Sequence, residues 1–80
     1  MPIAFILVNT AGESFSSVLE TLRKMDTVEE AYRVHTHGTC HIVAKVKTKT
    51  MKDLSDVVVQ LRFLNKVQST LTLLATEEPE

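Results

Sequence analysis

The residues with the most reactive side chains lie in one short segment, 35–41. It holds all three histidines and the single cysteine of the chain, namely His35, His37, Cys40 and His41. Imidazole and thiolate groups are good ligands for zinc or copper. A cysteine beside a histidine can also act as a nucleophile, although no third orienting group is evident in the sequence. The spacing matches no common zinc signature, so three interpretations stay open: a polar hairpin tip, a metal site and a nucleophilic centre.

A second set of polar side chains lies near the end of the chain. Thr70 and Thr72 are two residues apart in a β-prone segment, so a strand would point both hydroxyls the same way, toward a small polar ligand. Tyr32 is either a core or interface aromatic or an active-site phenol. The sequence contains neither a glycine-rich phosphate loop nor a carboxylate pair spaced for acid–base chemistry. We therefore expect no enzymatic activity and no cofactor.

The elements that must position these residues can be predicted from hydrophobic periodicity. Residues 3–8 are continuously apolar, which is typical of a central strand. Helical spacing of apolar residues follows Ser14 and Thr50, each a possible N-cap. Further strands are expected at 28–36, 40–46 and 67–75. The order β-α-β-β-α-β predicts an α+β, ferredoxin-like fold, with a four-stranded antiparallel sheet and two helices on one face.

This fold leaves one sheet face without helices. The first strand is apolar throughout, and the last strand ends in Leu71, Leu73, Leu74 and Ala75. A chain of 80 residues buries only about 60% of its unfolded surface, and a single cysteine cannot form an internal disulfide. A large apolar sheet face is unusual in a monomer. The sequence therefore predicts a homodimer in which a second copy covers that face.

Composition excludes several classes of partner. The net charge of −1 argues against direct nucleic-acid binding, which needs a cationic face. No apolar run approaches the ~20 residues of a membrane span, and the first residues lack a basic signal-peptide region. We therefore expect a cytoplasmic protein without membrane contact. Residues 1–76 should form a single ligand-binding domain, and 77–80 a disordered acidic tail.

Taken in order, several segments resemble a known family. They are 4–10 with Gly12, 22–25, 28–32, the Gly38 hairpin, 42–46 and, most distinctively, 67–73. Together they resemble the effector-binding (RAM) domain of the Lrp/AsnC transcriptional regulators, over residues 3–76.

The resemblance implies a ferredoxin-like domain that pairs through its sheets and assembles into an octamer or a similar ring. It implies an amino-acid effector bound between dimers near the second hairpin. Full-length members carry an N-terminal helix-turn-helix domain, so this chain resembles a stand-alone module that regulates through effector-linked oligomerisation, with a full-length regulator as a further partner. The effector contacts implied are Thr36, His37, Gly38, Thr39, Cys40, His41, Thr70 and Thr72.

One position departs from the family pattern. Members typically have Gly-x-x-Asp at the hairpin, whereas this chain has Gly38-Thr39-Cys40-His41. A histidine cannot pair with an effector ammonium group as a carboxylate does. Two alternatives to the regulatory module also remain. One is a dimeric α+β barrel enzyme with a pocket lined by Tyr32 and His35, and the other is a metal-binding module at 35–41.

Overall fold

The computed structural model describes residues 2–11, 14–36 and 39–75, and for Thr36, Thr39 and Cys40 it describes the backbone alone. The predicted order of elements is confirmed. The predicted acidic tail, 77–80, lies outside the described residues. The elements are β1 (Ile3–Thr10), α1 (Phe15–Arg23), β2 (Val28–Thr36), β3 (Thr39–Lys47), α2 (Met51–Arg62) and β4 (Val67–Ala75).

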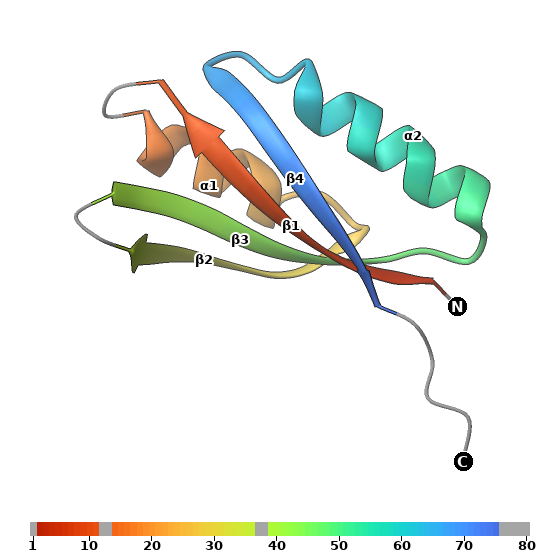
Figure 1. The fold of residues 1–80 in the computed structure, drawn as a ribbon. Coiled ribbons are helices and arrows are strands. Elements are labelled where there is room, and N and C mark those ends of the chain that lie inside the picture. Colours follow the sequence, from red (N-terminus) through yellow and green to blue (C-terminus); the bar gives the residue numbers. More distant parts are fainter. Residues whose placement is uncertain (1, 12–13, 37–38, 76–80) are drawn as a thin grey trace.

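The four strands form one antiparallel sheet in the order β2-β3-β1-β4, which is the ferredoxin-like arrangement (Figure 1). β1 therefore lies between β3 and β4, as its unbroken apolar run predicts. β2 and β4 are the edge strands of the sheet. β2 is more polar in sequence than the central strand β1, as is usual for a strand at a sheet edge. In the described part of the chain, no helix is both long enough and apolar enough to cross a membrane.

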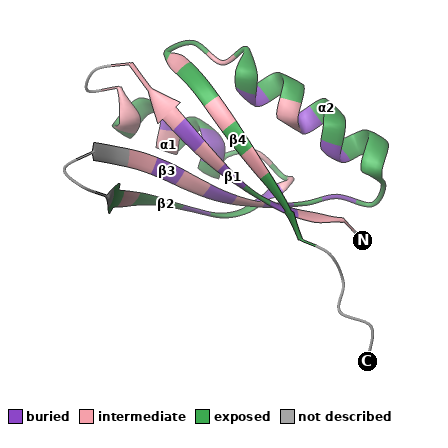
Figure 2. Ribbon diagram, viewed as in Figure 1, coloured by how far each residue is buried: buried purple, intermediate pink, exposed green. Residues whose placement is uncertain are grey.

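Both helices cover the same face of the sheet, and the core lies between them and the strands. Along β1 and β3, every second residue is buried, as the alternating colours in Figure 2 show. From α2, Leu54, Val57 and Leu61 reach the core, and from α1, Val18 and Leu22 do so. The buried strand residues are Ala4, Ile6, Val8, Val28, Ala31, Ile42, Ala44 and Val46.

The two helix starts differ in how they are capped. Thr50 lies in extended backbone, and its hydroxyl accepts a hydrogen bond from the Asp53 backbone N–H at 3.1 Å, which confirms it as the N-cap of α2. Ser14 precedes α1 as expected, but its side chain makes no cap hydrogen bond. Its φ and ψ of −87° and 4° depart from the extended geometry usual for a capping side chain. Its carbonyl instead accepts from the Val18 N–H and the Ser17 hydroxyl.

The end of α1 is fixed to the edge strand β2 by one arginine. Nε and Nη2 of Arg23 both donate to the carbonyl oxygen of Ala31, at 3.1 and 2.8 Å. A forked contact to one carbonyl satisfies a strand acceptor and holds the helix over the sheet. Nearby, the guanidinium of Arg33 stacks 4.0 Å from the centre of the Phe15 ring.

Candidate functional site

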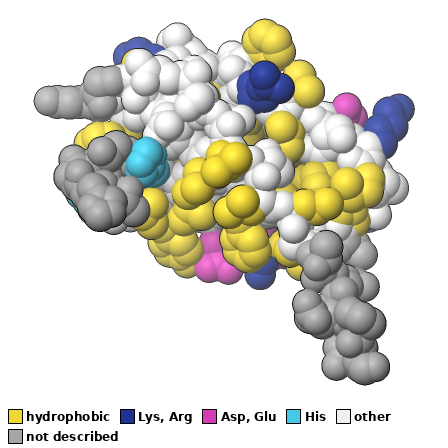
Figure 3. Space-filling model, viewed as in Figure 1, with side chains coloured by type: hydrophobic (Ala, Val, Ile, Leu, Met, Phe, Trp, Pro, Cys, Tyr) yellow, Lys and Arg dark blue, Asp and Glu magenta, His cyan; other side chains and the backbone are white. Residues whose placement is uncertain are grey.

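The sheet face opposite the helices, here called the open face, is largely apolar. Phe5, Tyr32, Leu71 and Leu73 are 40%, 53%, 56% and 50% exposed on it. Hydrophobic side chains extend across the strands in the space-filling view (Figure 3). One prediction needs correction, because Leu74 pairs with buried Ala4 and so points toward the helix side. The open face comprises Ile3, Phe5, Leu7, Tyr32, Val34, Val43, Leu71 and Leu73, flanked by polar side chains.

Polar side chains cross one end of the open face. Nδ1 of His41, on β3, donates a hydrogen bond to Oδ1 of Asn9 on β1. Nδ2 of Asn9 in turn donates to Oγ of Ser69 on β4, at 3.0 Å. This row joins three strands, and it commits one ring nitrogen of the half-buried His41 to a partner within the sheet.

At the β2 edge of the open face, the Tyr32 hydroxyl donates to Oε1 of Glu30 at 2.7 Å. This hydrogen bond raises the pKa of the Tyr32 phenol above 10.0, and the negative charge of Glu30 raises it further. The pair therefore stabilises the fold below the ordinary tyrosine pKa. That contribution is lost as pH rises through the folded-state pKa.

Replacing Glu30 with Gln should lower the pKa of Tyr32, because the substitution removes the carboxylate charge. The chain has one tyrosine and no tryptophan, so the ultraviolet absorbance of tyrosinate reports on this residue alone. Glu29→Gln is the matched control, since Glu29 lies 3.6 Å from Lys45 and does not contact the phenol. Coincident titration midpoints for wild type and Glu30→Gln would contradict this assignment.

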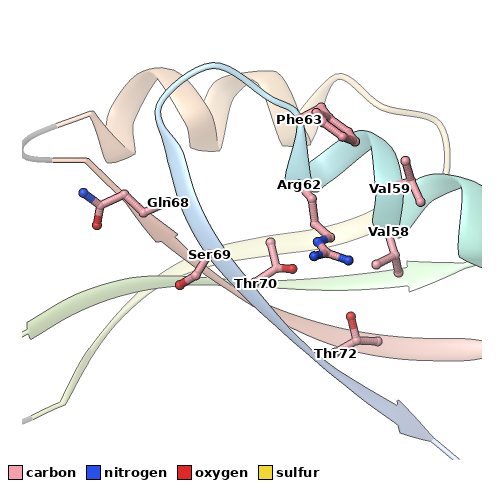
Figure 4. A pocket seen from close by; sticks show the side chains of 8 residues that line it. All are labelled: Val58, Val59, Arg62, Phe63, Gln68, Ser69, Thr70 and Thr72. Carbon is pink, nitrogen blue, oxygen red and sulfur yellow. The ribbon is translucent and has the colours of Figure 1, made fainter.

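The other candidate site is a groove of about 650 Å³ between the end of α2 and the outer edge of β4. We call it the α2–β4 groove. Its volume is in the range of small-molecule sites. Figure 4 shows Arg62 extending from α2 toward β4, into the space beside Thr70 and Thr72. The lining residues are Val58, Val59, Arg62, Phe63, Gln68, Ser69, Thr70 and Thr72.

The polar groups of this groove have unused hydrogen-bonding capacity. Within the described residues, the Arg62 guanidinium has no hydrogen-bond or ion-pair partner, and neither do the Thr70 and Thr72 hydroxyls. The apolar lining is equally open, with Val59 49% and Phe63 84% exposed. Val59 and Phe63 are four residues apart, which places them on one face of a helix. This apolar face is therefore not buried within one chain. A guanidinium, two hydroxyls and an apolar wall suit a small carboxylate-bearing molecule.

The residues predicted to bind an effector fall into four groups. His37 and Gly38 lie outside the described residues, and Thr36, Thr39 and Cys40 are placed only as paired strand backbone. His41 lies on the open face. Thr70 and Thr72 pair with buried Val8 and Ile6, so they point to the helix side. One chain therefore holds His41 and the two threonines on opposite faces of its sheet.

The strand register also bears on the two alternative functions, the enzyme and the metal-binding module. Tyr32 points to the open face, whereas His35 shares the helix side with Ala31, so the two do not line one pocket. Within the part of the chain that is described, no group of three or more His, Cys, Asp or Glu side chains could hold a metal ion. The metal interpretation also uses His37 and the Cys40 side chain, which lie outside that part.

Sequence reasoning missed Arg62 and Asn9. Arg62 precedes the apolar Phe63 at the end of a predicted helix, where a basic residue is usually explained by the helix dipole. One local signal does exist, since Arg62 lies four residues after Val58, so both lie on the side of α2 that flanks β4. Asn9 would have been found from its alternation with Phe5 and Leu7 along β1.

Comparisons with known proteins agree with this geometry. Residues 3–80 match the family model described as the Lrp/AsnC ligand binding domain. The chain is 36% identical to FFRP-DM1, whose crystal structure superposes with a TM-score of 0.88 over 95% of this chain and 100% of that one. It is 37% identical to the hypothetical protein PHS023 of Pyrococcus horikoshii, with a TM-score of 0.86 over 98% and 93% of the two chains.

Escherichia coli AsnC is 27% identical with a TM-score of 0.83, and the match covers 99% of this chain but 53% of AsnC. No curated protein matches the sequence. The family match extends over nearly all of the sequence, and the element order and four-stranded antiparallel sheet predicted from the residues are those of the structure. The chain belongs to the Lrp/AsnC ligand-binding domain family.

Proposed function

We propose that this chain is a regulatory module that binds a small effector, an amino acid or a related carboxylate, in the α2–β4 groove. The observation that carries the proposal is the guanidinium of Arg62 beside the hydroxyls of Thr70 and Thr72, all without a hydrogen-bond or ion-pair partner among the described residues. A guanidinium binds a carboxylate through two parallel hydrogen bonds, and neighbouring hydroxyls add donors. Membership of a ligand-binding domain family supports a binding role rather than catalysis.

The module acts as a homodimer that pairs through the open face. Four large apolar side chains on this face are at least 40% exposed in the single chain. Covering such a surface with a second copy removes apolar area from water, at roughly 25 cal/mol per Å². A two-fold pair is the simplest arrangement, because each copy then offers the same surface to the other.

A ring of dimers would allow the hairpin of one copy and the threonines of another to contact the same effector. His41 and Thr70 lie on opposite faces of their own sheet. An effector that touches both the hairpin and the groove must therefore be held by different copies. We propose that dimers associate in an octamer or a similar ring, with the groove of one dimer near the hairpin of the next.

Regulation then follows from thermodynamic linkage. An effector that binds between dimers has a higher affinity for the assembled state and shifts the population toward it. A full-length Lrp/AsnC regulator carries the same kind of domain and is a second partner for the open face. In such a mixed assembly the effector would control the regulator without this chain contacting DNA.

A thermal-shift screen over the amino acids and their related carboxylates tests the effector proposal, read alongside light scattering. A ligand at 100 times its dissociation constant stabilises the folded state by about 2.7 kcal/mol. We expect at least one compound to raise the melting temperature and to change the assembly state. If no compound in either class changes the melting temperature or the assembly, the effector proposal is wrong.

A further inference from the structure

The described residues that line the α2–β4 groove offer a positive charge but no negative one. Of its eight lining residues, Arg62 is the only charged side chain. Gln68, Thr70 and Thr72 contribute neutral polar side chains, and Val58, Val59 and Phe63 contribute apolar surface. Ser69 also lines the groove, but its hydroxyl accepts the Asn9 hydrogen bond on the open face. The groove can thus bind a carboxylate through Arg62 and a hydrocarbon chain through its apolar side chains. None of its described lining residues offers a carboxylate for an ammonium group.

None of the described carboxylates lines this groove. Glu30 accepts the Tyr32 hydroxyl on the open face, and Glu29 pairs with Lys45. Other acidic side chains line a separate groove of about 680 Å³ near the start of α2, together with lysines. The charged residues of that second groove are Asp26, Glu29, Lys47, Lys49, Asp53 and Asp56.

The position that resembles the family aspartate does not supply the missing charge. His41 has no negative charge in either protonation state, and its Nδ1 already donates to Asn9. If a neighbouring hairpin approached the groove, His41 could offer only Nε2, as a neutral acceptor or a cationic donor. An ammonium group held there would lose water without gaining an ion pair, which is unfavourable.

We propose that the groove selects apolar monocarboxylates without an α-ammonium group, such as branched-chain oxo acids, over the corresponding amino acids. Arg62 binds the carboxylate, the two threonine hydroxyls donate to its remaining lone pairs, and Val58, Val59 and Phe63 contact the hydrocarbon chain. This inference rests on the proposed function, because it names the ligand class of the same groove.

Four probes of similar shape test the inference by calorimetry on the intact protein: leucine, α-ketoisocaproate, isocaproate and isoamylamine. Isocaproate and α-ketoisocaproate should bind about tenfold or more tightly than leucine, which corresponds to about 1.4 kcal/mol. Isoamylamine, which keeps the ammonium group and lacks the carboxylate, should not bind. Tighter binding of leucine than of isocaproate would overturn the inference and leave the proposed function standing. If none of these probes and no amino acid binds, both are wrong.

Variants of Arg62 test whether isocaproate binds in the α2–β4 groove. Arg62→Gln should weaken isocaproate binding about tenfold or more, because it removes the carboxylate's cationic partner. Arg62→Lys keeps the positive charge and should weaken isocaproate binding less than Arg62→Gln does. Arg33→Gln is the matched control, since Arg33 is an exposed arginine that stacks on Phe15 outside the groove. Circular dichroism checks that each variant is folded. Unchanged isocaproate affinity in a folded Arg62→Gln variant would overturn the assignment to this groove.

Discussion

Replacing Leu71 with Glu should abolish the proposed open-face dimer and leave a monomer. Leu71 lies on the open face opposite Leu7 and is 56% exposed in the single chain. In a two-fold dimer, each interface would contain two of the new carboxylates. If each costs at least about 2 kcal/mol to desolvate, dimerisation weakens by about 4 kcal/mol, or roughly 1,000-fold.

Leu74→Glu is the control for this prediction. Leu74 lies on the same strand and is 49% exposed, but it points to the helix side of the sheet. It should therefore leave the proposed open-face dimer intact. Analytical ultracentrifugation at matched concentrations separates the two variants. A wild-type monomer at micromolar concentration, or a Leu71→Glu variant that remains dimeric, would contradict open-face pairing.

The second large effect concerns the helix that forms one wall of the α2–β4 groove. Leu61 has no exposed surface, and it holds the last turn of α2 against the sheet. Truncating a buried leucine to alanine costs about 2–5 kcal/mol through lost burial and the cavity left behind. An 80-residue domain has a total stability of only roughly 4–12 kcal/mol. Leu61→Ala should therefore remove a large share of the free energy of unfolding.

Val59→Ala provides the comparison for Leu61→Ala. Val59 lies two residues earlier on α2 and is 49% exposed, so its truncation should change the free energy of unfolding by about 0.5 kcal/mol or less. Urea unfolding measures both variants, at one chain concentration, because self-association contributes to apparent stability. A cost below about 1 kcal/mol for Leu61→Ala would show that α2 is not anchored by this residue.

Much of the fold could be predicted from the sequence because its signals are local. The strands Val28–Thr36 and Val67–Ala75 and the start of α2 at Met51 follow from alternation, helical spacing and the Thr50 cap. The central place of β1 follows from its apolar run. Ser14 shows the limit of such signals, because capping depends on backbone angles that its residue type does not determine.

The candidate site depended more on tertiary structure. Sequence spacing established that Thr70 and Thr72 share a face, since side chains alternate along any strand. It did not establish which face, and pairing with Val8 and Ile6 places them on the helix side, away from His41. The same register turns Leu74 away from Leu71 and Leu73.

The sequence by itself determined the elements of this protein, the chemistry of its hydroxyls and most of the apolar residues on the sheet face without helices. Only the tertiary structure brought Arg62 to Thr70 and paired His41 with Asn9. The physical reason is that periodicity is a property of neighbours along the chain. A binding groove instead depends on the register between strands and on the position of a helix that packs across them.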